Sequence, residues 1–431
     1  MKKCGIIFRM EKFRAGGIEV CFGAGRRDWL KLSYPADYGL FARVQWRGFE
    51  FDFNLNGQLK WVGGKPPAWP DARERLKRTA ANDFVYYAVF GYESARALTG
   101  AYYVPYTGRD DPEVFNERPF DRSFIGEALA AFEALADAAR DISASPPPGS
   151  HPRAVEFLSL AGRNGREALA ASAERLRDII GCSVPVLPPD AIEVDYEVVP
   201  VAVADGCCYQ CGFCGFREPG FNVRSPENIL SQIDALADFY GADLVNHNAL
   251  LAAGNDALAA GAETIERAAL AAYERFNFAR SYHNGARLFM FGSAGALLGA
   301  DAADLKTLDA LPFESVVNVG LESLDEETLR ALGKPLSAPD AREALARASS
   351  INSSMKNLRV SVNFVVGDAL PERHYDEIKK ALSDPALRRA RNTVYLAPLI
   401  GASPRRDTIR RLMEIKRASR ADVFLYLFQR L

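Results

Sequence analysis

The second half of the sequence alternates between short apolar strands and helical segments. Strands are expected at 194–204, 242–251, 287–291, 315–322, 358–366 and 392–399. Apolar residues at helical spacing separate each strand from the next. Such alternation is typical of parallel βαβ units, because a parallel strand pair needs a long crossover connection. The pattern therefore predicts a parallel α/β core of six strands.

A cysteine-rich run directly follows the first of these strands. Asp205 to Phe216 contains four of the seven cysteines. Three of them, Cys207, Cys211 and Cys214, have the spacing C-x3-C-x2-C. Thiolates this close together in a loop bind a soft metal or an iron–sulfur cluster. In a four-iron [4Fe–4S] cluster, three cysteine ligands leave one iron open, so the spacing favours such a cluster on these three residues.

Two other metal sites fit the sequence less well. A structural zinc site needs a fourth ligand nearby, and no histidine follows the run before His247. Cys208, Cys211 and Cys214 also have the spacing that begins a bacterial ferredoxin run, which needs a further Cys-Pro. No cysteine follows Cys214, so we interpret Cys208 as a thiol outside the cluster. The remaining cysteines are widely separated and are interpreted as plain buried thiols: Cys4, Cys21 and Cys182.

With Phe213 directly before its last cysteine, the C-x3-C-x2-C run resembles the signature of the radical S-adenosylmethionine (SAM) superfamily. This resemblance implies a partial (β/α)6 TIM-like barrel over roughly 195–400. It also implies that SAM chelates the open iron through its amino and carboxylate groups. A reduced cluster would cleave SAM to methionine and a 5′-deoxyadenosyl radical, which abstracts hydrogen from a substrate. The chain is thus expected to be an enzyme whose cofactors are a [4Fe–4S] cluster and SAM, with Phe213 close to them.

Polar residues near the ends of two predicted strands are candidate contacts for SAM. Active sites of parallel α/β barrels lie at the C-terminal ends of the strands, and a strand shows alternate residues to the interior. On the fourth strand, Asn318 and Glu322 share a face. Residues 320–329 resemble the fourth-strand segment of one branch of the superfamily. That branch includes coproporphyrinogen oxidases, the Elongator catalytic subunit and cobalamin-dependent enzymes. That resemblance places Glu322 near SAM, while Ser323 or Asp325 caps the next helix.

The fifth and second strands provide further candidates. Ser361 and Asn363 share a face, and the segment from Asn363 to Gly367 resembles the fifth-strand motif that packs against adenine in the superfamily. Gly254 and Asn255 occupy the place of its Gly-Gly-Glu segment, which binds the methionine amino group, although the second glycine and the acid are missing in register. Two asparagines on the second strand, Asn246 and Asn248, are predicted to face the substrate. Three histidines are predicted to be structural: His247, His283 and His374.

The first part of the chain has a different pattern. Residues 10–65 indicate an antiparallel meander with a hairpin turn at Asn56-Gly57. A helix is predicted at 71–78, a strand or helix at 83–91, a helix at 123–140 capped by Ser123 and a Pro-rich linker at 143–150. Residues 155–180 are predicted to form a helical hairpin or a long helix interrupted near 162–165. The predicted organisation is an N-terminal α+β domain (1–150), a helical connector (151–193), the radical SAM core barrel (194–400) and a C-terminal helical extension (401–431).

Composition limits the partners and the location. A net charge of −2 gives no electrostatic argument for a nucleic acid partner. The first apolar stretch is broken at Arg9, too early for a signal peptide, and no apolar segment is long enough for a bilayer. An odd, bunched set of cysteines indicates a reducing compartment, and hence a cytoplasmic protein. The expected partners are a small-molecule or peptide substrate and an electron donor such as a reductase, flavodoxin or ferredoxin.

Missing sequence features narrow the class of radical SAM enzyme. No cysteine set for a second cluster follows the barrel, no acetyltransferase domain follows it, and no Asp-x-His-x-x-Gly for cobalamin is present. The first hypothesis is a single-cluster enzyme that abstracts hydrogen from an unidentified organic substrate. An iron–sulfur redox or sensory protein that does not cleave SAM, and an Elongator-like tRNA-modifying enzyme, are the alternatives.

Overall fold

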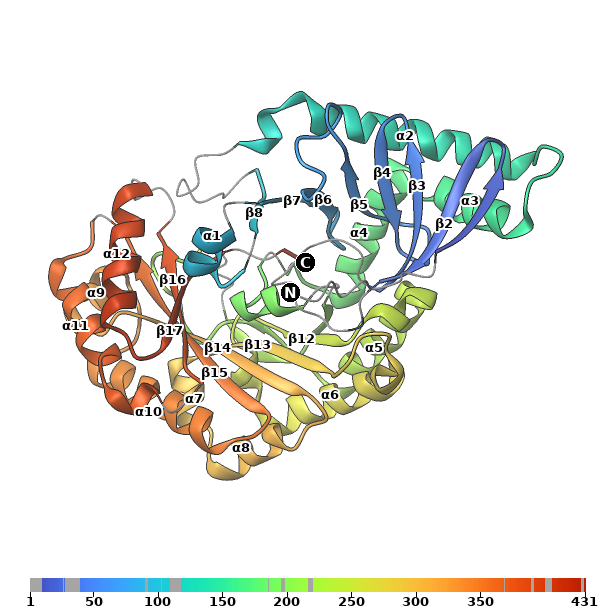
Figure 1. Ribbon diagram of the computed structural model, residues 1–431. Helices are drawn as coiled ribbons and strands as arrows, with labels where there is room; N and C mark the ends of the chain where they lie inside the picture. Colours follow the sequence, from blue (N-terminus) through green and yellow to red (C-terminus); the bar gives the residue numbers. More distant parts are fainter. Residues whose placement is uncertain are drawn as a thin grey trace, which may run out of the picture.

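A computed structural model of the chain describes residues 10–25, 27, 39–89, 92–101, 103–108, 118–184, 186–194, 198–215, 220–367, 369–388, 391–399, 405–427 and 430–431. These residues form an eight-stranded antiparallel sheet, a seven-stranded parallel sheet and a two-stranded sheet beside the cysteine run. The parallel sheet curves into a partial barrel with helices on its outside, and the antiparallel sheet lies across from it (Figure 1). The α/β fold class and the parallel core expected from the sequence are confirmed.

The antiparallel sheet is a meander in which each strand pairs with the next one in the chain. Its turn at Gly57 has a φ of 81°, which favours glycine, so the predicted hairpin is confirmed. One face of the sheet packs against α2, where Phe51 lies 6.1 Å from Phe132 between ring centres. The strands are β1 Glu11–Ala15, β2 Ile18–Ala24, β3 Leu40–Trp46, β4 Phe49–Phe53, β5 Leu59–Gly64, β6 Arg75–Arg78, β7 Phe84–Ala88 and β8 Val104–Tyr106.

Two local predictions in this sheet region are wrong. Strand β6 is found where a helix was predicted at 71–78. The neighbouring strands β5 and β7 form backbone hydrogen bonds with it, and local sequence propensity does not take such long-range pairing into account. Leu76 then enters the core, and the Arg78 guanidinium donates to the Leu59 carbonyl at 2.9 Å. Ser123 is the first helical residue of α2 instead of its N-cap, and Arg122 precedes it without a side-chain cap. The undecided segment at 83–91 contains strand β7.

Three helices connect the two sheets: α2 Ser123–Ala144, α3 Pro152–Arg163 and α4 Arg166–Ile180. The predicted interruption near residue 164 is confirmed by the end of α3. α2 and α3 pack together closely, since a Cβ on Gly162 would lie 2.7 Å from the backbone nitrogen of Arg140. The Pro-rich stretch therefore joins two packed helices. α3 also contacts β1 and β2, and α4 contacts the first barrel strand. The domain boundaries proposed from the sequence stay a prediction.

The parallel sheet has the order β17-β16-β15-β14-β13-β12-β9. All six predicted strands are present within it: β9 Val199–Ala202, β12 Ala249–Ala253, β13 Arg287–Ser293, β14 Glu314–Glu322, β15 Leu358–Val366 and β16 Thr393–Pro398. The outer helices are α5 Pro226–Tyr240, α6 Ala262–Arg275, α7 Ala294–Gly299, α8 Ala302–Asp309, α9 Glu326–Ala331, α10 Ala338–Ser354, α11 Glu372–Leu382 and α12 Arg405–Ala418. A seventh strand, β17 Asp422–Leu425, corrects the expectation of a purely helical C-terminal extension. Its four residues are too few for a periodic signal, and pairing with β16 defines it.

The prediction that Asn246 and Asn248 face the substrate is wrong. β12 begins only at Ala249, after a 3₁₀ helix that ends at Asn246. The Asn246 amide pairs with the backbone of Leu40, accepting at 2.7 Å and donating at 2.9 Å. Asn248 donates to the Gly285 carbonyl at 2.8 Å. Both amides therefore lie at the N-terminal end of the strand, opposite the cysteine run, and help to fasten the antiparallel sheet and neighbouring loops to the barrel.

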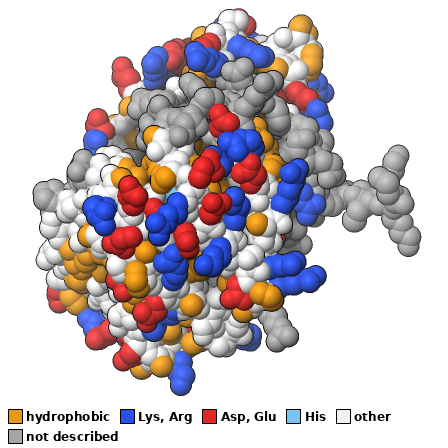
Figure 2. All heavy atoms as spheres, turned by 90° about the vertical axis from the view of Figure 1, so that its left-hand side faces the viewer, with side chains coloured by type: hydrophobic (Ala, Val, Ile, Leu, Met, Phe, Trp, Pro, Cys, Tyr) orange, Lys and Arg blue, Asp and Glu red, His pale blue; other side chains and the backbone are white. Residues whose placement is uncertain are grey.

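The outer face near the C-terminal helices carries mixed charge. Figure 2 shows basic and acidic side chains interspersed there, without a broad patch of one sign. On α12, Arg411 pairs with Glu372, and Arg410 pairs with Glu414 at 2.8 Å. The basic residues of this helix are thus partly neutralised by neighbours. Among the described residues, no helix has both the length and the apolar character needed to cross a membrane.

Candidate functional site

A small sheet holds the base of the cysteine run. β10 Ala204–Gly206 pairs with β11 Phe221–Val223 across the run. Gly206 has a φ of 71°, and a Cβ there would lie 1.6 Å from the Gly220 carbonyl oxygen. Only glycine fits that position, because any side chain would collide with backbone. The Cys207 N–H then donates to the same carbonyl at 3.2 Å, which fixes where the first cysteine emerges.

An ion pair fastens the same small sheet to the helices before it. The Arg224 guanidinium contacts the Asp205 carboxylate at 2.5 Å and donates to the Ile180 carbonyl at 2.6 Å. Arg224 is mostly buried, whereas Asp205 is more exposed. A charge-assisted contact of this kind is stronger than a neutral hydrogen bond. It links the base of the cysteine run to the end of α4.

The tip of the run docks on two barrel helices. The Gly212 N–H donates to the carbonyl of Leu332, at the end of α9, at 3.0 Å. The Tyr209 hydroxyl accepts from the Gly295 N–H at 3.0 Å, at the start of α7. Docked at both ends, the run crosses the C-terminal ends of the barrel strands, where active sites of such folds lie.

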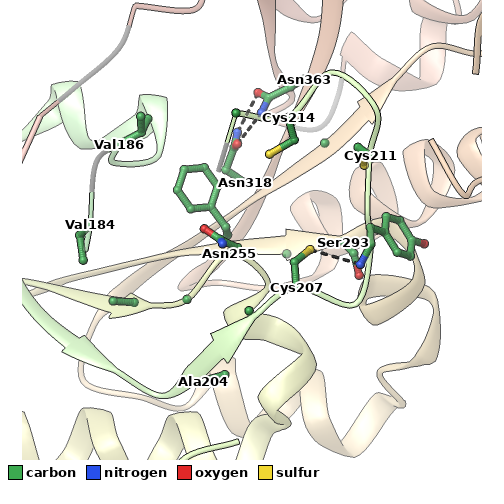
Figure 3. Close-up of a pocket in the computed structure, with 18 of the residues that line it drawn as sticks. Val184, Val186, Ala204, Cys207, Cys211, Cys214, Asn255, Ser293, Asn318 and Asn363 are labelled. Atoms are coloured by element: carbon green, nitrogen blue, oxygen red, sulfur yellow. Dashed lines mark hydrogen bonds between the residues drawn. The ribbon is translucent and has the colours of Figure 1, made fainter. Parts of the chain in front are cut away.

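The three predicted cluster ligands line one cavity of about 510 Å³. This volume falls in the range of roughly 300–1,000 Å³ that small-molecule sites have. Figure 3 shows Cys207, Cys211 and Cys214 around it. Cys211 is buried and the other two are half-buried. Cys208 is exposed and does not line the cavity.

The donor set fits an iron–sulfur cluster. Among the described residues, no group of three or more His, Cys, Asp or Glu side chains is arranged to hold one metal ion. Cluster thiolates stand further apart than the ligands of a single ion, because each binds a different iron. Three thiols lining one cavity are soft donors of the kind that iron–sulfur clusters take. Burial raises the pKa of the Cys211 thiol, and the nearby Lys334 ammonium opposes that rise.

The predicted SAM contact Glu322 ends β14 at this cavity. Its φ is 65°, and the β14–β15 register shifts just before it. Its carboxylate lies 3.5 Å from the Lys334 ammonium, and both side chains are mostly buried. Burial raises the pKa of Glu322, and Lys334 opposes the rise. The pKa of Lys334 is also raised, because the attraction of Glu322 and other groups outweighs the lowering effect of burial.

Lys334 was missed in the sequence, and it connects three parts of the site. Its ammonium lies 5.3 Å from the centre of the Tyr209 ring in the cysteine run, a cation–π distance. It also lines the cavity. The segment after Glu322 behaves as predicted, since the Asp325 carboxylate accepts from the Thr328 N–H at 3.0 Å and caps α9. No signal in the sequence brings Lys334 back to the carboxylate twelve positions earlier.

The other predicted SAM residues do not all reach the cavity. Gly254, Asn255 and Phe213 line it, and Phe213 is 38% exposed. Gly254 has a φ of 145°, and a Cβ there would lie 3.0 Å from the Ala204 carbonyl oxygen, so its backbone is held close to the base of the run. Asn318 and Asn363 also line the cavity, but Ser361 is not among the lining residues.

A buried polar network occupies the interior below the cysteine run. Ser361 donates to the Asp190 carboxylate at 2.6 Å, and Tyr395 donates to it at 3.1 Å. Asn318 donates to Ser361 at 2.8 Å and to Asn363 at 3.0 Å. Asp190 belongs to the 3₁₀ helix Pro189–Glu193 before β9. Nothing in the sequence of that helix distinguishes Asp190 from a surface carboxylate, so its place in the site is not predictable from the sequence.

Burial perturbs the carboxylate of this network. Asp190 is fully enclosed, and the loss of water raises its pKa to about 6, while the hydrogen bond from Ser361 opposes the rise. The histidines predicted to be structural are buried: His374 lies between the Ser323 hydroxyl at 2.7 Å and the Val365 carbonyl at 3.0 Å. His247 and His283 are buried as well.

Residues 201–382 match the family model of the Radical SAM superfamily. The match spans the cysteine run and the barrel from β12 to α11. The chain therefore carries a radical SAM domain over these residues. Proteins of that superfamily carry out SAM-dependent radical chemistry, with an iron–sulfur cluster and SAM as cofactors. No curated protein matches the sequence.

Several solved structures resemble the chain at low identity. A radical SAM methyltransferase from Sphaerobacter thermophilus is 15% identical over 53% of this chain and 66% of its own, with a TM-score of 0.37. The cobalamin-dependent SAM radical enzyme OxsB is 16% identical over 52% of this chain and 30% of its own, with a TM-score of 0.35. Methylornithine synthase (PylB) is 11% identical over 69% of this chain and 84% of its own, with a TM-score of 0.34. The chain thus spans 66% and 30% of the first two proteins.

Proposed function

We propose that Cys207, Cys211 and Cys214 hold a single [4Fe–4S] cluster and that SAM binds beside it in the cavity. The observation that carries this proposal is that all three thiols of the C-x3-C-x2-C run open onto one cavity together with Glu322. When bound, such a cluster supplies the electron that cleaves SAM to a 5′-deoxyadenosyl radical, which abstracts hydrogen from an organic substrate. The substrate is a small molecule or a peptide, and the electron comes from a reductase, flavodoxin or ferredoxin.

The protein's own side chains contribute binding and orientation. Glu322 accepts hydrogen bonds from the ribose hydroxyls or the amino group of SAM, and Lys334 at 3.5 Å opposes the rise in its pKa that burial causes. Gly254 and Asn255 present backbone and amide groups to the methionine end of SAM, and Phe213 packs against it. Apolar side chains on the cavity wall, including Leu251 and Phe291, exclude water from the reacting atoms.

Anaerobic reconstitution tests the proposal. The purified full chain is loaded with iron and sulfide, reduced with dithionite and supplied with SAM. Release of 5′-deoxyadenosine, together with an electron paramagnetic resonance signal that changes when SAM is added, supports it. An intact cluster without 5′-deoxyadenosine release favours a redox or sensory protein. Salt-sensitive retention of tRNA by the same preparation would favour the Elongator-like alternative.

A further inference from the structure

The interior of the barrel carries a second recognition surface below the cysteine run. Asn318 lies four positions before Glu322 on β14, which is roughly 13 Å deeper at about 3.3 Å per strand residue. Asn363 on β15 pairs in register with Gly320, between those two levels. Both amides line the cavity, as Figure 3 shows. Asn318 therefore lies deeper in the barrel than Glu322, whereas Asn363 lies at the level of Gly320, close to the Glu322 carboxylate.

A chain of hydrogen bonds fixes the orientation of both amides. The Ser361 hydroxyl gives its proton to Asp190 at 2.6 Å, so its oxygen must accept from Asn318, which donates at 2.8 Å. The Asn318 amide nitrogen therefore faces Ser361. It also donates to the Asn363 oxygen at 3.0 Å, and the Asn363 nitrogen donates back to the Asn318 oxygen at 2.6 Å.

Counting donors and acceptors shows what Asn363 presents. An asparagine amide has two N–H donors and an oxygen with two lone pairs. Asn318 uses both of its donors within the described protein, whereas Asn363 uses one donor and one lone pair on Asn318. Within the described part of the chain, one N–H and one lone pair of Asn363 stay unused beside the cavity. This unused N–H of Asn363 can donate to the carbonyl oxygen of another amide, and the unused lone pair can accept from the N–H of that same amide.

The charges around the cavity argue against an ionic ligand at this depth. Among the described lining residues, Asp205 is paired with Arg224 and Glu322 with Lys334. The Asp190 carboxylate beneath the amide pair repels an anion. Its two oxygens already accept hydrogen bonds from Ser361 and Tyr395, so they offer no direct contact to an ammonium group. Apolar side chains form part of the cavity wall: Val184, Val186, Leu251 and Phe291.

We propose that Asn363, oriented by Asn318, Ser361 and Asp190, recognises a neutral amide group on the substrate. This inference rests on the proposed function, because it assigns a substrate class to the same cavity. Asn363 is the contact residue, and Ser361 and Asp190 are positioning residues. The substrate is then an apolar molecule or peptide whose carboxamide, lactam or peptide group enters the barrel first. The sequence assigned Asn318, Ser361 and Asn363 to SAM instead, and that assignment is the rival interpretation.

Binding of small probes tests the inference without radical chemistry. Benzamide, benzoate and benzylamine have the same ring with a neutral, an anionic and a cationic group. Saturation-transfer NMR on the full chain, loaded with cluster and SAM, gives the dissociation constant of each. We expect benzamide to bind about tenfold more tightly than the other two, a difference of ~1.4 kcal/mol. Equal binding of the three probes by the wild-type protein overturns the inference, whether or not any variant folds.

Variants separate the contact residue from general destabilisation. Asn363→Asp keeps the shape but replaces the donor with a charge, and it is expected to lose the preference for benzamide. Asn357→Asp, at the opposite end of β15, is the matched control and should keep it. Ser361→Ala should weaken the preference and Ser361→Thr should restore it, whereas a purely structural role would change only the melting temperature. Unchanged selectivity in Asn363→Asp overturns the inference.

The rival interpretation is measured on the same samples. If the amide pair binds SAM, Asn363→Asp should raise the dissociation constant of SAM, measured by calorimetry, about as much as that of benzamide. Our inference requires that SAM binding change little. Failure of 5′-deoxyadenosine release with intact benzamide selectivity would contradict the proposed function but not the amide site. Loss of SAM binding in Asn363→Asp overturns the amide site but leaves the radical SAM proposal intact.

Discussion

The N–H of Gly212 donates a 3.0 Å hydrogen bond to the carbonyl of Leu332, and this bond joins the cysteine run to the end of α9. The two backbones approach so closely that a Cβ on Gly212 would lie 2.9 Å from that carbonyl oxygen. On the other side of the contact, a Cβ on Gly333 would lie 3.1 Å from the Gly212 nitrogen. The position of the cluster ligands thus depends on a glycine–glycine contact, and Lys334 follows directly after it.

Gly212→Ala should therefore displace the cysteine run. The added methyl group meets backbone that cannot rotate away, and such overpacking costs about 1–3 kcal/mol. We expect a lower melting temperature and a lower iron content after reconstitution. Gly215→Ala is the matched control in the same run, because nothing lies within 4 Å of its Cβ position. Equal iron content in the two variants would show that the contact with α9 does not position the ligands.

Substitution of single cysteines tests the ligand set. Cys207→Ala, Cys211→Ala and Cys214→Ala should each lose the cluster, because a cluster with two protein ligands is held weakly. Cys208→Ala should keep iron near the wild-type content, since its thiol is exposed and does not line the cavity. Iron and sulfide analysis with absorption spectra measures both. An empty site in Cys208→Ala would mean that the assigned ligand register is wrong.

Much of the barrel could be predicted from the sequence because its elements carry their own periodic patterns. β15 has the predicted bounds, 358–366. Two of the errors are short strands without such a pattern. β6 and β17 have four residues each, and pairing with neighbouring strands defines them. The local sequence of each strand does not show which strands it will pair with.

The candidate site also contains residues that could be predicted from local sequence and residues that could not. The cysteine run could be read because its three thiols are close in sequence and their spacing carries chemistry. Asp190 could not be predicted as a site residue, because its carboxylate accepts a hydrogen bond from the Ser361 hydroxyl, and Ser361 lies 171 positions later in the sequence. Ser361 faces inward as its strand parity predicted, but its hydroxyl is used by the protein. Strand parity gives the direction of a side chain and not its depth.

Lys334→Met tests the buried pair beside the cysteine run. Removing one partner of a buried ion pair costs about 3–5 kcal/mol, because the other charge stays buried. The pKa of Glu322, already raised by burial, should rise further without the opposing ammonium. If ionised Glu322 binds SAM, then SAM affinity should fall near neutral pH and recover partly at higher pH. Calorimetry from pH 6.5 to 9 measures this, with Lys356→Met on the exposed surface as control. An unchanged pH profile would exclude Glu322 as an ionised contact of SAM.

The pH dependence of stability tests the environment of Asp190. Its pKa rises from 3.8 to about 6 on folding, because burial removes water from the carboxylate. Between these values the folded state holds more protons than the unfolded state, so this residue's contribution to stability falls as the pH rises through 6. A shift of this size corresponds to about 3 kcal/mol, since one pKa unit is worth about 1.4 kcal/mol.

Asp190→Asn removes that titration, and the amide still accepts a hydrogen bond through its oxygen. The free energy of unfolding of the variant should therefore increase relative to that of the wild type between pH 4.5 and pH 7, which means that the variant becomes relatively more stable. Urea unfolding at each pH measures the difference. Asp137→Asn, an exposed carboxylate on α2, controls for the loss of one negative charge. The pKa of Asp190 rises because its carboxylate is enclosed, so a difference that stays constant with pH would mean that water reaches it.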